Sequence, residues 1–235
     1  VYTKQDLCKK LGINEGVKIG FVAAHIFKDA PHLSSSMLHD DYYCWLSDTI
    51  NCCAKSQKVH WIFKPHPSAS YYGEDGLVEQ LVQNRDAANL HLCPNDLNTS
   101  SLQDCADVIL TVLGTIGLEY SCLGIPTILA GTSFYAGFDF TYDPSTIEEY
   151  KEMVSNAASL EKLTPAKISK ALRVYYEWEK QFDWENPIIT DKVLKNVWGV
   201  ENDRDQVKAY NIMSENLISI NPRSLKLWEY VQSIV

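Results

Sequence analysis

A lysine and a histidine stand close together in the segment Lys64-Pro65-His66-Pro67. The prolines on either side of His66 deny its backbone a helical or mid-strand conformation, which fixes the direction of the imidazole. An ammonium is a point charge for phosphate oxygens, and an imidazole adds a directional hydrogen-bond donor. We therefore predict that Lys64 and His66 contact phosphate. The alternative is a surface turn in which the histidine packs on neighbouring aromatic rings.

A second polar group lies within Leu110–Leu129, which reads LTVLGTIGLEYSCLGIPTIL. A buried strand is expected to end at Gly114, and a helix is predicted from about Thr115 onward. Free N–H groups and the positive dipole end at the start of a helix attract anions. Thr115 adds a hydroxyl, and Glu119 lies one helical turn further on the same face. The alternative is a tight strand-to-helix turn without a ligand, in which Glu119 is an ordinary exposed carboxylate.

Three common motifs are missing from the sequence. The order Gly-x-x-Gly-x-Glu differs from the glycine order of a dinucleotide-binding fingerprint. No Gly-Lys-Ser/Thr sequence of a Walker motif occurs, and no Gly-x-Ser-x-Gly nucleophile elbow is present. The polar groups therefore indicate anion binding of another kind.

Acid–base chemistry has two candidates, His25 and Asp29, which flank the end of the first predicted strand. A capping or positioning role is the alternative for both, and we leave the catalytic base unassigned. Asp40 and Asp41 are neighbours in a predicted helix, so their carboxylates diverge and are expected to be solvated. The remaining histidines lack metal-ligand spacing, and we expect no metal ion. They are His32, His39, His60 and His91.

The elements that must position these residues alternate between short apolar runs and helical patterns. Strands are predicted at 18–24, 59–63, 89–92, 107–112 and 126–130, with helices at 37–55, 76–84 and 115–123. Residues 98–101 offer N-cap residues for a further short helix that ends at Asp104. This alternation is typical of an α/β fold with a Rossmann-like, doubly wound parallel sheet. In such sheets ligands bind outside the carboxyl ends of the strands. Four of these ends are followed by polar residues, namely His25, Lys64 to His66, Gly114 and Thr115, and Gly131 to Ser133. We therefore expect these residues to lie along one edge of the sheet.

The chain is predicted to have three parts. Residues 1–17 form a linker or short helix, residues 18–143 the Rossmann-like domain, and residues 144–235 a helical C-terminal extension. In the extension, helices are predicted from Pro144 to Leu160, with Asp143 or Ser145 as the cap, and from Thr164 to about Phe182. Further helices are predicted at 187–198, 202–218 and 222–235.

Composition narrows the class of protein. The 235 residues are 46% hydrophobic and 22% charged, which suits a globular protein. The formal net charge of -9 argues against general nucleic-acid binding. No apolar run approaches the roughly 20 residues that span a bilayer. The seven cysteines form no C-x-x-C pair and are expected to be reduced thiols of a cytoplasmic protein.

Three motifs together resemble a known family. KPHP, GTIGLEYSCLGIP and GTSFYAGFDFTYD follow one another as in the bacterial capsule polysaccharide biosynthesis family, which includes Kdo transferases. The His-Pro motif is also similar to that of CMP-sialic-acid transferases. The resemblance covers roughly Lys18 to Asp143.

The resemblance implies the C-terminal, donor-binding domain of a GT-B glycosyltransferase. By this resemblance His66, Gly114, Thr115 and Gly117 hold the donor phosphate beside Lys64, and Glu119 contacts the sugar or ribose. Ser133 and Tyr135 belong to a loop beside the donor and are expected to bind it as well. Enzymes of this type generally work without a divalent ion or another cofactor.

The resemblance implies transfer from a nucleotide sugar, CMP-linked such as CMP-Kdo, to a glycan or glycolipid acceptor in bacterial surface polysaccharide synthesis. A missing N-terminal domain would supply the facing half of the cleft, and the protein would be cytoplasmic or peripheral to the inner membrane. Two alternatives stay open. One is a CDP-glycerol-type polyol-phosphate transferase, and the other is a non-catalytic nucleotide-sugar-binding or scaffold domain of a larger synthase.

Overall fold

The computed structural model describes residues 2–29, 36–97, 101–180, 191–198 and 205–219. The chain divides into two compact units, residues 1–175 and residues 176–235. The first unit contains a β-sheet with helices on both faces, and the described part of the second consists of helices. The compact unit around the sheet therefore extends well beyond Asp143, where a domain boundary was predicted.

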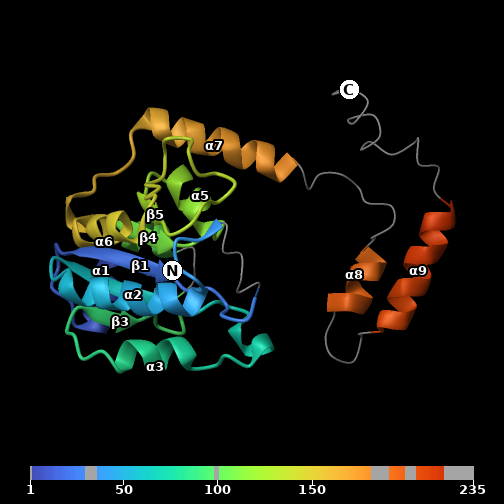
Figure 1. Ribbon diagram of the computed structural model, residues 1–235, viewed down its shortest axis with the longest axis horizontal. Helices are drawn as coiled ribbons and strands as arrows, with labels where there is room; N and C mark the ends of the chain where they lie inside the picture. Colours follow the sequence, from blue (N-terminus) through green and yellow to red (C-terminus); the bar gives the residue numbers. More distant parts are fainter. Residues whose placement is uncertain (1, 30–35, 98–100, 181–190, 199–204, 220–235) are drawn as a thin grey trace. The chain divides into compact units, whose positions relative to one another are not determined.

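Five parallel strands form the sheet of the first unit, in the order β3-β2-β1-β4-β5 (Figure 1). Their bounds are β1 Lys18–Ala23, β2 Val59–Lys64, β3 Leu90–Leu92, β4 Val108–Thr111 and β5 Thr127–Leu129. The order reverses between β1 and β4, which pair with each other at the centre of the sheet. This is the doubly wound, Rossmann-like arrangement, and it confirms the predicted fold class.

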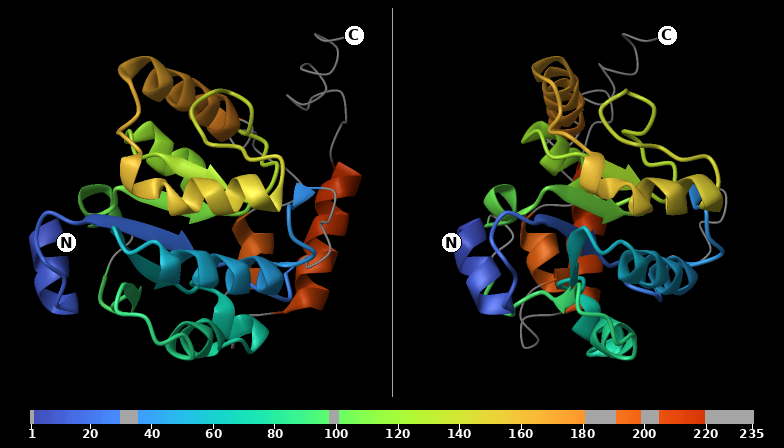
Figure 2. Two further views of the ribbon diagram at one scale, coloured as in Figure 1. Left: turned by 60° about the vertical axis from the view of Figure 1, so that its left-hand side comes forward. Right: turned by 90° about the vertical axis from the view of Figure 1, so that its left-hand side faces the viewer.

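Helices flank the sheet and continue into the second unit (Figures 1 and 2). They are α1 Lys4–Leu11, α2 Tyr42–Lys55, α3 Leu77–Gln83, α4 Leu102–Cys105, α5 Ile116–Cys122, α6 Ile147–Ser155, α7 Pro165–Lys180, α8 Asp191–Trp198 and α9 Gln206–Ser219. Two 3-10 turns lie at Ala69–Tyr72 and Ala157–Ser159. In the second unit, α8 packs against α9, and the Asp205 N–H donates to the Asn196 carbonyl at 2.9 Å.

The larger core lies between the sheet and the helices α2, α3 and α6. Tyr150 on α6 is fully buried there. Its hydroxyl accepts a hydrogen bond from Trp45 Nε1 at 3.0 Å and shares another with Thr49 Oγ1 at 2.9 Å. Helix α6 is therefore an integral layer of the sheet domain. Helices α1, α4 and α5 contribute to the core on the other face.

Two predicted helix starts were wrong. Helix α6 begins after Thr146, whose hydroxyl accepts from the Glu149 N–H, so neither Asp143 nor Ser145 is the cap. Helix α2 begins at Tyr42 rather than at residue 37, because Asp41 accepts from the Cys44 N–H as its N-cap. Asp41 therefore has a structural role that its assignment to a solvated face missed.

One predicted helix start is confirmed, and others lie outside the described residues. Helix α7 begins at Pro165, as predicted. The predicted helix at 222–235 lies outside the described residues, as do the predicted starts at 187 and 202.

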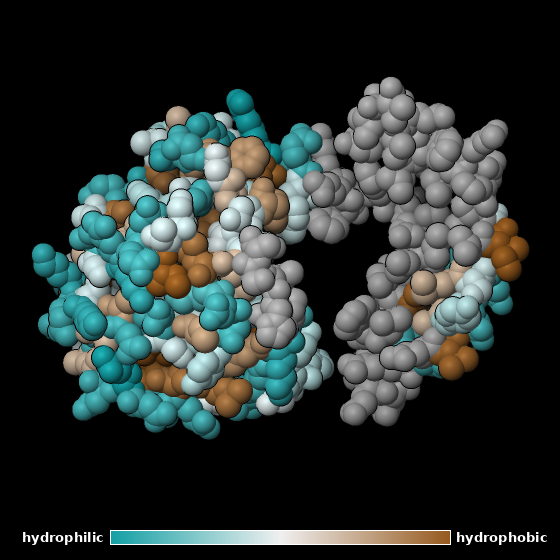
Figure 3. All heavy atoms as spheres, viewed as in Figure 1, coloured by the Kyte–Doolittle hydropathy of each residue, from teal (hydrophilic) through white to brown (hydrophobic). Residues whose placement is uncertain are grey.

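The visible surface of the first unit carries mostly hydrophilic side chains, with apolar ones in small separate groups (Figure 3). No helix among the described residues is both long enough and apolar enough to cross a membrane. The seven cysteines all lie within the described ranges, and each is a free thiol.

Candidate functional site

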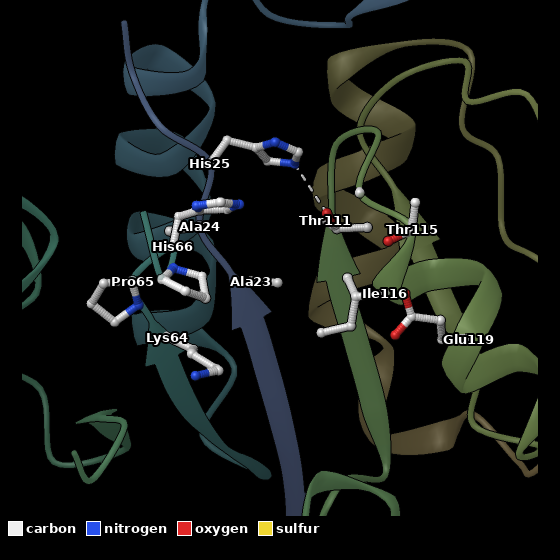
Figure 4. A pocket seen from close by; sticks show the side chains of 12 residues that line it. Ala23, Ala24, His25, Lys64, Pro65, His66, Thr111, Thr115, Ile116 and Glu119 are labelled. Atoms are coloured by element: carbon white, nitrogen blue, oxygen red, sulfur yellow. Dashed lines mark hydrogen bonds between the residues drawn. The ribbon is translucent and has the colours of Figure 1, made fainter. Parts of the chain in front are cut away.

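A pocket of about 310 Å³ opens at the carboxyl ends of β1, β2 and β4 (Figure 4). This is where the strand order reverses, the position at which doubly wound sheets bind their ligands. The lining residues are Ala23, Ala24, His25, Lys64, Pro65, His66, Pro67, Thr111, Gly114, Thr115, Ile116 and Glu119. The structure therefore brings together five of the eight predicted donor-binding residues.

One wall carries the cationic and imidazole groups. Lys64 is the last residue of β2; its side chain is half-buried and makes no ion pair with any described residue. The Ser68 N–H donates to His66 Nδ1 at 3.1 Å, so Nε2 carries the hydrogen of the neutral ring. Partial burial lowers the pKa of His66, the charge of Lys64 lowers it further, and Asp29 opposes the shift. His66 is thus a neutral donor toward the pocket at pH 7.

The opposite wall carries oxygen groups (Figure 4). Thr115 is the N-cap of α5, but its hydroxyl makes no capping hydrogen bond. Glu119 lies one turn further on and is half-buried. Neither side chain has a hydrogen-bond or ionic partner among the described residues. Both are therefore available to a ligand, and they lie across the pocket from Lys64 and His66.

His25 is held in one orientation at the end of β1. Its Nε2 accepts from the Val112 N–H at 3.2 Å and lies 3.1 Å from Thr111 Oγ1. The ring stacks on Tyr42 with centroids 4.5 Å apart. Because Nε2 is an acceptor, the hydrogen of the neutral ring is on Nδ1. Burial, with a smaller contribution from His66, lowers the pKa of His25 to about 4.

This geometry limits the acid–base candidates. The Nε2 lone pair of His25 is occupied by a backbone donor, and the ring is neutral at pH 7. Asp29 is exposed in a turn beyond β1, and its charge raises the pKa of His66. His25 therefore lines the pocket as a neutral ring of fixed orientation, and Asp29 lies outside the pocket lining.

The neutral, half-buried state of His25 predicts a pH-dependent stability. The unfolded imidazole has an ordinary pKa of 6.5 and the folded one about 4. Between these values the unfolded chain binds more protons, so the free energy of unfolding falls as pH falls, by up to about 1.4 kcal/mol per pH unit. Denaturant unfolding from pH 7 to pH 4 should show this loss, and it should be shallower in His25→Gln.

His91 also contributes to the pH dependence of stability, in the parent and in His25→Gln alike. Its pKa is also lowered to about 4, by burial and by His60, whose Nδ1 lies 2.8 Å from His91 Nε2. The same loss from His91 is therefore present in both proteins. Equal slopes for the parent and His25→Gln would contradict the assignment of His25.

Three predicted site residues do not line the pocket. Gly117 and Ser133 are buried, and Tyr135 is fully buried. Tyr135 instead donates from its hydroxyl to the Gly114 carbonyl, behind the pocket wall. Thr111 lines the pocket and was missed. Its position at the end of β4 was the signal that could have identified it.

Across the ranges that the structure describes, no three His, Cys, Asp or Glu side chains are grouped so as to hold a metal ion.

No family model and no curated protein matches the sequence. Several solved structures resemble the chain, glycosyltransferases among them. KpsC of Thermosulfurimonas dismutans, a β-Kdo 2,7 transferase, is 21% identical with a TM-score of 0.41, over 69% of this chain and 56% of that one. A UDP-forming trehalose-phosphate synthase of Burkholderia vietnamiensis is 12% identical with a TM-score of 0.49, over 76% and 46%. Anabaena HepE, solved with UDP-glucose, is 12% identical with a TM-score of 0.43, over 92% and 52%.

The chain spans about half the length of each of these solved structures. Its own strand order and its parallel pairing define the fold independently of them. The first unit is a Rossmann-like α/β domain with a pocket at its topological switch point, and polar and charged side chains form part of the lining.

Proposed function

We propose that this chain is the donor-binding half of a GT-B glycosyltransferase and that the pocket holds the phosphate of a nucleotide-activated sugar. The observation that carries the proposal is the convergence of the Lys64 ammonium, the His66 imidazole and the Thr115 hydroxyl at the switch point. Neither the ammonium nor the hydroxyl has a partner among the residues that the structure describes. These groups arrive from two strand ends that are separated in the sequence. A turn without a ligand would not require an unpaired, half-buried cation there.

The chemistry of transfer suits these groups. When the bond between the sugar and the phosphate breaks, negative charge develops on the leaving phosphate. Lys64 stabilises this charge as a cation, and His66 Nε2–H and Thr115 Oγ–H stabilise it as oriented donors. Because an ammonium and two donors serve the phosphate, we propose that transfer needs no metal ion or other cofactor.

The proposed identities of the donor and the acceptor rest on the resemblance of the three sequence motifs to the capsule polysaccharide family. We propose a CMP-linked donor such as CMP-Kdo and a glycan or glycolipid acceptor. Glu119, which has no partner in the described part of the chain, accepts from hydroxyls of the sugar or ribose. A further domain supplies the facing half of the cleft and the catalytic base.

Calorimetric titration with CMP, CDP, UDP and cytidine tests the proposal. We expect saturable binding of CMP and weaker binding of cytidine, with loss of the CMP signal in His66→Ala and Thr115→Val. His91→Ala is the matched control, because its imidazole lies on the edge strand β3 outside the pocket. If both pocket variants bind CMP as the parent does, the site assignment is wrong. Tighter binding of CDP than of CMP would indicate a CDP-linked donor instead.

A further inference from the structure

The loop after β5 is hydrogen-bonded to the back of the pocket wall. The Tyr135 hydroxyl donates to the Gly114 carbonyl at 2.5 Å. The Ser133 hydroxyl donates to the Leu113 carbonyl at 3.4 Å. Both side chains are buried. Neither side chain lines the pocket, so two consecutive carbonyls of the glycine turn are held by residues outside the pocket lining. The Gly114 carbonyl also accepts from the Gly117 N–H at 3.0 Å.

Peptide geometry sets the direction of the next two N–H groups. In a planar trans peptide, the N–H points opposite to the carbonyl of the preceding residue. All peptide bonds between described residues here are trans. Fixing the Leu113 carbonyl therefore turns the Gly114 N–H toward the opposite side, and fixing the Gly114 carbonyl does the same for the Thr115 N–H. Gly114 and Thr115 line the pocket on that side, and neither N–H has an acceptor among the described residues.

The glycine at position 117 allows Tyr135 to approach the start of α5. A Cβ atom at Gly117 would lie 2.3 Å from the Tyr135 hydroxyl oxygen, so the helix approaches the tyrosine closely only because residue 117 is glycine. The Tyr135 ring stacks on Phe140 with centroids 6.3 Å apart. Burial raises the pKa of Tyr135 well above its ordinary value, which keeps the hydroxyl protonated and able to donate.

We propose that Tyr135 and Ser133 are positioning residues that turn the Gly114 and Thr115 N–H groups toward the phosphate of the donor. This inference rests on the proposed function, because the phosphate is the group that the two N–H donors receive. The sequence suggested that Ser133 and Tyr135 contact the donor directly, whereas here they orient the backbone of the turn that contacts it. Tyr135 acts through the backbone of Gly114 and never touches the ligand.

Tyr135→Phe tests the inference, because it removes the hydroxyl and keeps the ring. We expect about fivefold weaker CMP binding, the typical effect of one lost hydrogen bond, with unchanged binding of cytidine. The amide proton shifts of Gly114 and Thr115 on addition of CMP should shrink. Tyr150→Phe is the matched control, since it also removes a buried tyrosine hydroxyl with hydrogen-bond partners, but far from the turn. It should destabilise the fold and leave CMP affinity unchanged.

The outcomes separate the two proposals. If the parent binds no CMP, the proposed donor fails, and titration with inorganic pyrophosphate followed at the same two amides still decides the positioning role. Unchanged phosphate affinity in Tyr135→Phe overturns that role, as does an equal loss for CMP and cytidine, which would show a merely structural effect. Ser133→Ala provides the same comparison with a smaller change should Tyr135→Phe fail to fold.

Discussion

Replacing Lys64 by glutamine is expected to weaken CMP binding by about ten- to a hundredfold. A hydrogen bond to a charged group contributes about 1.5–3 kcal/mol, and 1.4 kcal/mol is about a factor of ten in affinity. The Lys64 ammonium is half-buried and unpaired among the described residues, so it has no internal partner to lose. Calorimetry should show the loss for CMP and an unchanged affinity for cytidine, which lacks the phosphate.

Lys55→Gln is the control for this experiment. It makes the same chemical change at the C-terminal end of α2, at an exposed position outside the pocket lining. We expect CMP affinity to stay as in the parent. The affinity of the parent should also fall with added salt more steeply than that of Lys64→Gln, because only the parent has the charge. Equal losses in the two variants would show a general charge effect and remove Lys64 from the site.

Gly20→Ala is expected to have the largest effect on stability, destabilising the fold by roughly 3 kcal/mol. Gly20 lies in β1 beside β2, and a Cβ atom there would lie 2.3 Å from two ring carbons of Trp61. Trp61 is fully buried in the main core, so its ring has little room to move. Urea unfolding followed by circular dichroism measures the change.

Two further variants isolate the cause. Gly12→Ala meets no atom within 4 Å and suffers only from its left-handed φ of 66°, so it should cost roughly 1 kcal/mol. Trp61→Leu removes the ring that the methyl group added at position 20 would meet. In a double-mutant cycle, the cost of Gly20→Ala should be much smaller in the Trp61→Leu background. Additive costs would show that the clash with Trp61 is not the reason.

Much of the fold was predictable because its signals are local. Strands β1, β2, β4 and β5 are short, mainly apolar runs with buried residues, and buried parallel strands show this pattern without regular alternation. Pro165 began α7 as the rule for the first helical position predicts. The start of α6 was harder, because Asp143, Ser145 and Thr146 are all good caps, and only the geometry of the chain selects Thr146.

The site was predictable where residues follow a strand end. Lys64, His66 and Thr115 meet in one pocket because parallel strands end at the same edge. The roles of Gly117 and Tyr135 were not predictable, since each depends on a contact between segments far apart in the sequence. The same holds for His25, whose Nε2 is occupied by a backbone N–H of another strand end.

A crystal structure of the chain with bound CMP tests the central claim most directly. We predict that the phosphate lies in the pocket at the switch point, within hydrogen-bond distance of Lys64 Nζ, His66 Nε2 and Thr115 Oγ1. Its oxygens should also receive the N–H groups of Gly114 and Thr115. A nucleotide bound elsewhere, or one whose phosphate points into solvent away from Lys64 and His66, would contradict the account.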